Sequence, residues 1–194
     1  LNSLTPLNTL IIGLLFFSIQ VERRQIIGVI MGFLGCLLLV YFGNNDNTTE
    51  NYLYAILIFI ASIMYGLNVN FIKKYLSDLK PLTISVGNFT IMLIPAFLIL
   101  FFSGFFDIVS EEKTQHALLF ITILGIVGTG FSNILFFKLI QLSSPIFASS
   151  VTYIIPVVAF ILGFSFMNET LNIFQVFGAL VVLLGVYFSS RKSS

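Results

Sequence analysis

The sequence predicts an all-α membrane protein, a polytopic bundle of transmembrane helices. Hydrophobic residues make up 58% of the chain and charged residues only 9%, whereas soluble domains carry roughly a quarter charged residues. The apolar residues also gather into runs of about 20, the length that a helix needs to cross a bilayer. The lipid bilayer is therefore the main predicted partner. A net charge of +1 gives no reason to expect nucleic acid.

Seven spans follow from these runs. The first lacks the basic leading region and the small-residue cleavage site of a signal peptide, so we interpret it as a helix. Each later span follows a loop with charged or turn-forming residues, and the two longest loops, residues 43–50 and 106–116, are too short to fold alone. From the N-terminus, the predicted spans are residues 4–20, 26–43, 52–72, 82–106, 118–139, 145–167 and 171–188.

Basic residues in the loops predict how the chain lies in a cell membrane. If the spans alternate in direction, eight of the nine Lys and Arg residues fall on one side and only Lys113 falls on the other. Short cytoplasmic loops carry an excess of Lys and Arg, so that side is predicted to be cytoplasmic, with the C-terminus on it. The eight residues are Arg23, Arg24, Lys73, Lys74, Lys80, Lys138, Arg191 and Lys192.

The first two spans and the last two are similar in sequence. Identical residues align at an offset of 150 without gaps. The charge rule places the loop of the first pair inside and the loop of the second pair outside, so the copies are predicted to be inverted. Inverted repeats are a construction that secondary transporters use. The aligned pairs include Pro6 and Pro156, Gly13 and Gly163, Phe16 and Phe166, Gln25 and Gln175, Gly28 and Gly178, and Gly35 and Gly185.

Four residues of the sixth span share one helix face. Ser149, Thr152, Tyr153 and Pro156 recur at i, i+3, i+4 and i+7. One interpretation is a cavity wall that contacts substrate, with Pro156 breaking the backbone hydrogen bonds near mid-membrane. The alternative is that Ser and Thr bond back to their own helix and that Pro156 only kinks it. The repeat favours the cavity wall, because the corresponding residues of the first span are again mostly polar.

Polar residues of three other spans are further candidates for the cavity wall. Tyr65 and Asn68 lie together on the third span, Asn88 lies on the fourth and Asn133 lies on the fifth. An amide that faces lipid costs on the order of 2–7 kcal/mol, so these side chains should face inward. Asn also joins helices to one another, which leaves packing as the alternative. Glu169, before the last span, is predicted to cap that helix.

Several function classes lack their sequence signals. No Asp, Glu, Lys, Arg or His lies near the middle of a span, whereas proton relays and ion-coupled pumps usually carry such residues. The sequence has no P-loop and no nucleophile paired with a His or with metal ligands. Its one cysteine, Cys36, cannot form a disulfide within the chain. The sequence therefore predicts neither an enzyme nor a bound cofactor or metal.

Two stretches resemble the EamA domain of the drug/metabolite transporter superfamily. One is the apolar run from Pro156 to Glu169 with Gly178 and Gly185 after it, and the other is LGIVGTGFSNILFFKLIQLSSP, residues 124–145. The resemblance implies a ten-helix protein built from two five-helix domains in inverted orientation. The function it implies is a carrier that moves a small organic metabolite, such as an amino acid or a sugar, across the cytoplasmic membrane by alternating access, often as an exporter.

The resemblance also implies a division of the chain. Residues 1–43 are expected to be the last two helices of a first domain, and residues 44–50 an extracytoplasmic linker. Residues 51–189 are expected to be a complete second domain, followed by a cytoplasmic tail at 190–194. Three helices are then expected before residue 1, and a homodimer is a further expectation. The alternative function is a non-transporting membrane scaffold or assembly subunit, which tight packing without a central cavity would favour.

Overall fold

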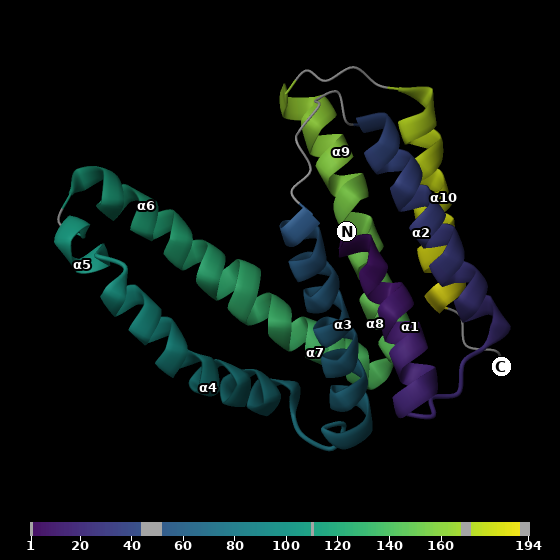
Figure 1. The fold of residues 1–194 in the computed structure, drawn as a ribbon, viewed down its shortest axis with the longest axis horizontal. Coiled ribbons are helices and arrows are strands. Elements are labelled where there is room, and N and C mark those ends of the chain that lie inside the picture. The colour runs from purple at the N-terminus through teal and green to yellow at the C-terminus, as the bar shows by residue number, and fades with distance from the viewer. Residues whose placement is uncertain (1, 44–51, 110, 168–171, 191–194) are drawn as a thin grey trace. The chain divides into compact units, whose positions relative to one another are not determined.

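The computed structural model describes residues 2–43, 52–109, 111–167 and 172–190, and the regular elements in these ranges are all helical (Figure 1). Within these ranges, six helical stretches are long and apolar enough to cross a membrane, so the chain is a multi-pass membrane protein in contact with lipid. In chain order, the elements are η1 (Asn2–Leu4), α1 (Thr5–Phe16), α2 (Arg23–Gly43), α3 (Tyr52–Tyr75), α4 (Pro81–Phe102), α5 (Phe105–Ile108), α6 (Glu112–Ile123), the π-helical η2 (Leu124–Phe131), α7 (Ser132–Leu142), α8 (Pro145–Ser150), the 3-10 helix η3 (Val151–Tyr153), α9 (Ile154–Met167) and α10 (Ile173–Ser190).

The predicted first span is not among these six. Its helix, α1, has 12 residues, which at 1.5 Å per residue is about 18 Å and falls short of a hydrocarbon core of about 30 Å. The helix ends because the carbonyl of Gly13 accepts hydrogen bonds from the backbone N–H groups of Phe17 and Ile19 (3.2 and 3.1 Å), and Ser18 takes a positive φ of 52°. A count of seven spans is therefore not confirmed.

The other predicted spans differ from the structure mainly at their ends. The fourth was expected to reach residue 106, but α4 stops at Phe102 and Gly104 adopts a left-handed φ of 72°, which turns the chain into α5. The fifth is longer than expected, because α6, η2 and α7 form one continuous stretch from Glu112 to Leu142. The linker 44–50 and the tail beyond Ser190 lie outside the described residues.

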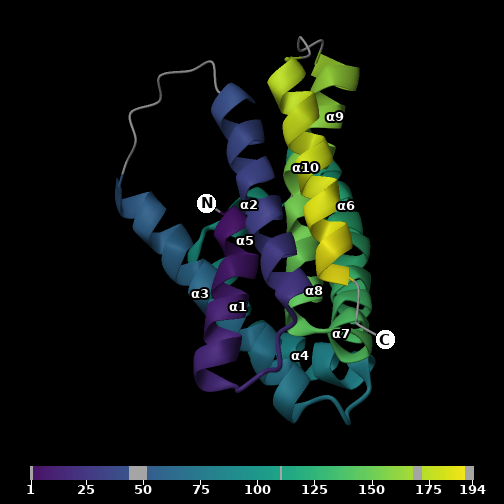
Figure 2. The ribbon, with the colours of Figure 1, turned by 90° about the vertical axis from the view of Figure 1, so that its right-hand side faces the viewer.

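The chain divides into two compact units: residues 1–74 with 143–194, and residues 75–142. In the first unit, α2 and α10 run antiparallel and side by side, as both views show (Figures 1 and 2). Glycines allow the two backbones to meet. A Cβ atom added to Gly35 would lie 2.8 Å from the carbonyl oxygen of Gly178 and 2.8 Å from the backbone nitrogen of Val182.

The same contacts recur elsewhere along this pair of helices. A Cβ atom added to Gly185 would lie 2.7 Å from the carbonyl oxygen of Gly28 and 2.5 Å from the backbone nitrogen of Gly32. Subtracting the offset of 150 from residue 185 gives residue 35, and adding it to residues 28 and 32 gives residues 178 and 182. The α2–α10 contact is therefore made twice, with the roles of the two helices exchanged.

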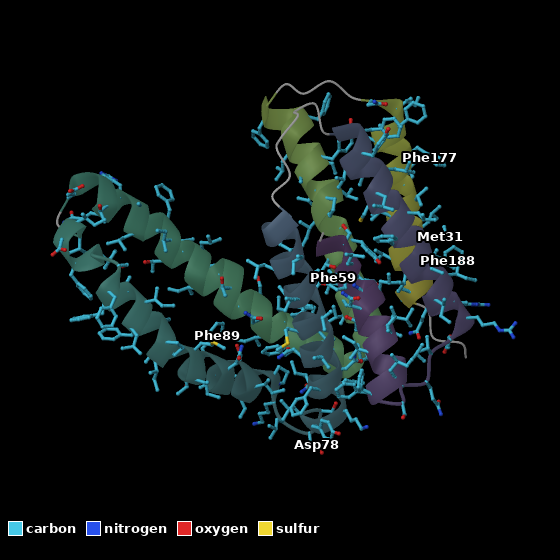
Figure 3. All side chains as sticks on the ribbon, viewed as in Figure 1. Met31, Phe59, Asp78, Phe89, Phe177 and Phe188 are labelled. Carbon is cyan, nitrogen blue, oxygen red and sulfur yellow. The ribbon has the colours of Figure 1, made fainter. Side chains whose placement is uncertain are left out.

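The core of the first unit lies beside this glycine contact. One buried cluster joins α2, η3, α9 and α10 through Cys36, Tyr153, Val157 and Val182, and another joins α1, α2 and α8 through Leu10, Val29 and Ile146. The outer side of α10 is different, because Phe177 is 59% exposed and projects away from α2 (Figure 3). An apolar residue in that position suits contact with lipid.

The second unit is a long helical hairpin. Helix α4 packs against α7, and α5 lies at the turn between α4 and α6. The side-chain amide of Gln141, near the end of α7, donates hydrogen bonds to the carbonyl oxygens of Leu76 and Leu79 (3.2 and 2.7 Å) and so holds the loop before α4. Most side chains of α4 are exposed, with Ile84 and Ser85 as the buried ones.

Candidate functional site

The polar face predicted on the sixth span lies on α8, η3 and α9. Helix α8 begins at Pro145, and the hydroxyl oxygen of Ser144 caps it by accepting a hydrogen bond from the Phe147 backbone N–H (3.1 Å). The chain then tightens into the 3-10 turn η3, one turn before Pro156. A proline at this place removes a backbone N–H from the helix and so favours such an irregularity.

The hydroxyl groups of this face bond to their own helix. Ser149 donates to the carbonyl oxygen of Ile146 (3.0 Å), and Thr152 donates to the carbonyl oxygen of Ser149 (2.7 Å). Ser149 is buried and Thr152 is half-buried. This is the arrangement that the sequence left open as the alternative to a cavity wall. Substrate contact by these residues, and by the half-buried Pro156, stays a prediction.

Tyr153 is fully buried in the first unit. Its hydroxyl donates a hydrogen bond to the carbonyl oxygen of Val29 on α2 (3.1 Å). Its ring lies against Gly32, where an added Cβ atom would come within 2.5 Å of the ring. The phenol therefore joins η3 to α2 with its polar group satisfied by protein. A direct contact between Tyr153 and substrate stays a prediction.

A polar seam between α1 and α3, formed by Asn8, Thr9, Ser62, Gly66 and Asn70, was missed from the sequence. The Asn8 amide donates to the Ser62 hydroxyl (2.7 Å), and the Asn70 amide donates to the carbonyl oxygens of Thr9 and Gly66 (2.9 Å each). All five residues are buried. The Asn70 side-chain oxygen has no hydrogen-bond partner in the described part of the chain.

The signal for this seam is its spacing. Ser62, Gly66 and Asn70 recur every four residues, and small residues at that interval let membrane helices approach closely. A Cβ atom added to Gly66 would lie 3.0 Å from the Thr9 backbone nitrogen. The predicted pair Tyr65 and Asn68 lies on a neighbouring face of α3, where Tyr65 is 37% exposed and Asn68 is exposed.

Three predicted candidates carry amides without a hydrogen-bond partner in the described part of the chain. Asn68 and Asn88 are exposed and Asn133 is half-buried, and none of their side chains makes a hydrogen bond to another described residue. Asn68 lies seven residues before the end of α3, Asn88 seven after the start of α4, and Asn133 nine before the end of α7. At 1.5 Å per residue these positions are about 10–14 Å along the helix from its end. In a helix that spans the bilayer, that distance corresponds to the hydrocarbon region.

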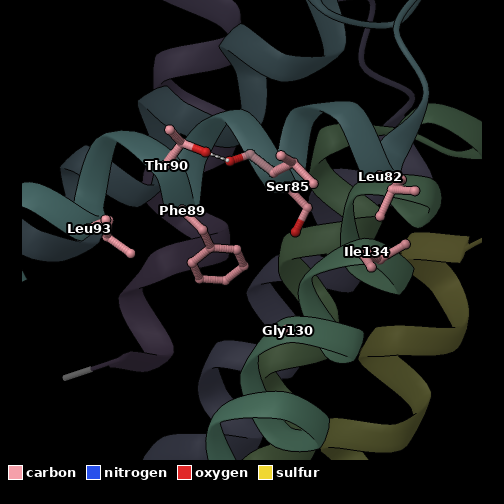
Figure 4. A pocket seen from close by; sticks show the side chains of 8 residues that line it. Leu82, Ser85, Phe89, Thr90, Leu93, Gly130 and Ile134 are labelled. Atoms are coloured by element: carbon pink, nitrogen blue, oxygen red, sulfur yellow. Dashed lines mark hydrogen bonds between the residues drawn. The ribbon is translucent and has the colours of Figure 1, made fainter.

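A groove of about 350 Å³ lies in the second unit, between α4 and the stretch formed by η2 and α7 (Figure 4). The Phe89 ring projects from α4 into this space, and Gly130 leaves its opposite wall without a side chain. The Thr90 hydroxyl donates to the Val86 carbonyl oxygen (2.8 Å). The residues that line the groove are Leu82, Ser85, Val86, Phe89, Thr90, Leu93, Gly130 and Ile134.

The groove lies beside an irregular helix. In η2 the turns are wider than in an α-helix, and the hydroxyls of Thr129 and Ser132 donate to carbonyl oxygens five residues earlier, those of Leu124 and Val127 (3.5 and 3.1 Å). Such π-helical turns are frequent at functional sites. No group of three or more His, Cys, Asp or Glu side chains that could hold a metal occurs in the described ranges.

The helices after the two repeat loops are capped in the same way. The side-chain oxygen of Gln25 accepts from the Glu22 backbone N–H (3.3 Å), and that of Gln175 accepts from the Asn172 backbone N–H (3.2 Å). Each glutamine makes the half of a capping box in which the third helical residue bonds to the N-cap backbone, and the two pairs are related by the offset of 150. The predicted cap Glu169 lies outside the described residues.

The chain is similar to several known proteins, each named an uncharacterized transporter. One from Archaeoglobus fulgidus is 26% identical over 98% of this chain and 66% of its own length. One from Haemophilus influenzae is 24% identical over 97% of this chain and 63% of its own length. YoaV from Bacillus subtilis is 25% identical over 96% of this chain and 65% of its own length. The chain thus spans less than two thirds of these relatives. No solved structure matches the chain.

The model of the EamA-like transporter family matches residues 52–191. These residues are most of the chain, and they begin at the first residue of α3 and pass beyond the end of α10. The match includes the groove, the exposed amides and α10 with its two glycines. This chain therefore belongs to the EamA-like transporter family, within the drug/metabolite transporter superfamily.

Proposed function

We propose that this chain is part of a carrier that moves a small organic metabolite across the cytoplasmic membrane by alternating access, in the direction of export. The family is one of transporters rather than enzymes, and its similar members are named transporters. Because the chain covers less than two thirds of those relatives, the proposal concerns the activity of the whole protein.

The observation that carries the proposal is the set of exposed amides at membrane depth. Asn68, Asn88 and Asn133 lack hydrogen-bond partners in the described residues, and an amide in hydrocarbon costs several kcal/mol. A polar substrate or the water of a transport path would remove that cost. We therefore assign substrate contact to these three residues. We also assign it to Tyr65, because Tyr65 lies one turn before Asn68 on the same helix. Substrate contact by Ser149, Thr152, Tyr153 and Pro156, as the sequence predicts, is part of the same proposal.

The duplicated contact between α2 and α10 supports alternating access. Gly28 meets Gly185 and Gly35 meets Gly178, which is the pairing that a two-fold axis in the membrane plane would produce between two inverted copies. In carriers with inverted repeats, one half rocks against the other around a site near the midplane. A ten-helix protein with two such halves is the architecture that we propose.

A counterflow assay tests transport whatever the energy source of the carrier is. Proteoliposomes loaded with an unlabelled amino acid, sugar or derivative should exchange it for the labelled compound outside. Asn88→Leu and Asn133→Leu should each lower exchange by about tenfold, because a lost substrate hydrogen bond to a polar group costs about 1–1.5 kcal/mol. Thr90→Val is the matched control, because the Thr90 hydroxyl is already bonded to Val86.

Two results would contradict this proposal. If the Asn→Leu variants exchange normally and resist unfolding better than the unaltered protein, the amides face lipid. If no compound of the panel exchanges although the protein is folded, a membrane scaffold becomes the better assignment. The proposed orientation, with a cytoplasmic C-terminus, is tested by cysteine labelling in intact cells. A cysteine at Ser77 should be protected from an impermeant reagent, whereas one at Asn45, outside the described residues, should react.

A further inference from the structure

The groove in the second unit has a charged end. We propose that it binds a single anionic phospholipid, with one acyl chain along Leu82, Phe89 and Leu93 and the headgroup phosphate at Lys80 and Lys138. This site goes beyond the proposed transport function and does not depend on it.

The dimensions of the groove suit an acyl chain. From Leu82 to Leu93, α4 contributes a largely apolar wall of 12 residues, and the 11 steps of 1.5 Å between its ends add up to about 16 Å. One leaflet is half of the hydrocarbon thickness of about 30 Å. Gly130 and Ile134 form the facing wall, and the polar lining groups, from Ser85 and Thr90, are hydroxyls without charge. The groove is therefore apolar over the depth of one leaflet.

Two lysines lie at the same end of this groove. Lys80 directly precedes α4 and is two residues from Leu82, and Lys138 follows Ile134 by four residues, hence on the same face of α7. Gln141, a turn beyond Lys138, bonds to the carbonyl oxygen of Leu79 (2.7 Å). This hydrogen bond holds the end of α7 beside the residue that precedes Lys80.

The charge at this end is suited to a phosphate. Lys80 and Lys138 are exposed, and neither forms an ion pair with another described residue. Asp78, also exposed, is the one acidic residue in the loop between α3 and α4, so this loop and the end of α7 contribute Lys80 and Lys138 against one carboxylate. Basic pockets between transmembrane helices bind anionic lipid headgroups.

The far end of the unit has the opposite charge. The sequence from α5 to the first turn of α6 contains Asp107, Glu111 and Glu112 against one basic residue, Lys113. An anionic headgroup would be repelled there. The lysine pair and the acidic turn therefore fix one orientation of the lipid, with its headgroup at the start of α4.

These 194 residues contain no tryptophan, so a single introduced Trp can report on the groove in the whole protein once any Trp elsewhere in it has been replaced by Phe. Phe89→Trp places the reporter in the groove. Ile91→Trp, on the same helix but 71% exposed and on the opposite face, is the matched control. Each variant is reconstituted in phosphatidylcholine bilayers that contain brominated phosphatidylglycerol or brominated phosphatidylcholine, and the ratio of the two quenching constants measures lipid preference.

The Phe89→Trp reporter should prefer brominated phosphatidylglycerol by about tenfold, and the Ile91→Trp reporter should show a ratio near one. Lys80→Gln and Lys138→Gln should each lower the groove ratio by about three- to fivefold, the effect of one basic residue near an anionic surface. Asp78→Asn should raise it. Leu93→Trp is a second groove reporter in case the first disturbs folding.

Three outcomes would overturn the proposal. Equal preference at the groove and control positions would mean that the groove selects no lipid. If Lys80→Gln and Lys138→Gln leave the ratio of quenching constants at the groove reporter unchanged, the headgroup does not bind at these two lysines. If neither brominated lipid quenches either groove reporter, protein covers the groove in the bilayer.

Discussion

Alanine at Gly185 should weaken the contact between α2 and α10 more than a single methyl group suggests. Its Cβ atom would lie 2.5 Å from the Gly32 nitrogen, 2.7 Å from the Gly28 carbonyl oxygen and 2.8 Å from the Gly32 Cα atom. Real Cβ atoms do not approach backbone atoms so closely. The helices must therefore separate by several tenths of an ångström along the whole contact.

The expected cost follows from two opposing terms. Overpacking of a close-packed contact costs about 1–3 kcal/mol, and loss of the close approach also weakens the buried contacts of Val182, which is fully buried beside it. Alanine favours a helix over glycine by about 0.5–1 kcal/mol. The net destabilisation of Gly185→Ala should be about 1–2 kcal/mol. Gly178→Ala should cost less, because its Cβ atom would lie 3.1–3.3 Å from its neighbours.

Two glycines of the second unit provide the control. An added Cβ atom at Gly87 or Gly125 meets no atom within 4 Å among the described residues, so Gly87→Ala and Gly125→Ala should be neutral or stabilising by about 0.5–1 kcal/mol. Unfolding in mixed micelles, followed by the helical circular dichroism signal, measures all four variants. If Gly185→Ala is as stable as the two controls, the close contact between α2 and α10 does not exist in the membrane protein.

Three further predictions concern single side chains. Gln25→Ala and Gln175→Ala should each cost about 0.5–1 kcal/mol of unfolding free energy in the same assay, because each removes one half of a capping box; unchanged stability in both would contradict the symmetric caps. Tyr153→Phe should cost about 1 kcal/mol by removing the hydrogen bond to Val29 and should leave counterflow intact, whereas loss of exchange in a stable variant would show that the hydroxyl meets substrate. Asn70→Leu should lower the free energy of unfolding by about 1–2 kcal/mol, because the Asn70 amide donates one hydrogen bond to the Thr9 carbonyl oxygen on α1 and one to the Gly66 carbonyl oxygen on its own helix. A stabilised variant would show that the amide does not make these bonds.

The positions of the membrane spans were predictable because lipid imposes a simple requirement. A helix in hydrocarbon satisfies its own backbone, so an apolar run of sufficient length can be read directly as a span. That rule gave the sixth span with its observed bounds, from Pro145 to Met167. The first span, predicted for residues 4–20, is not confirmed, because the end of α1 depends on local hydrogen bonds to the Gly13 carbonyl and on the positive φ of Ser18, which hydropathy does not report.

The partners of polar side chains were much harder to predict. The sequence places Asn68 and Asn70 two residues apart on one helix, and both have the same chemistry. Only the structure separates them, because Gly66 brings α1 close to the face of α3 that carries Asn70. Tyr153 shows the same limit: its periodicity predicts a face shared with Ser149 and Thr152, but the identity of its partner, the Val29 carbonyl, depends on how α2 packs.

The duplicated contacts suggest which part of the proposed carrier stays fixed during transport. If an axis in the membrane plane relates the two copies, it passes through the α2–α10 pair, because the contact of Gly28 with Gly185 maps onto that of Gly178 with Gly35. The axis exchanges these two contacts, so the interface between α2 and α10 maps onto itself as a whole. An interface of this kind can be the same whichever half is open, so alternating access does not require it to change. The sequences of the flanking helices do differ between the copies, since Tyr153 corresponds to Ser3. In the proposed carrier, we therefore expect the energy difference between the two states to arise in those helices and in the polar residues around them, with the glycine contacts of α2 and α10 as the fixed support.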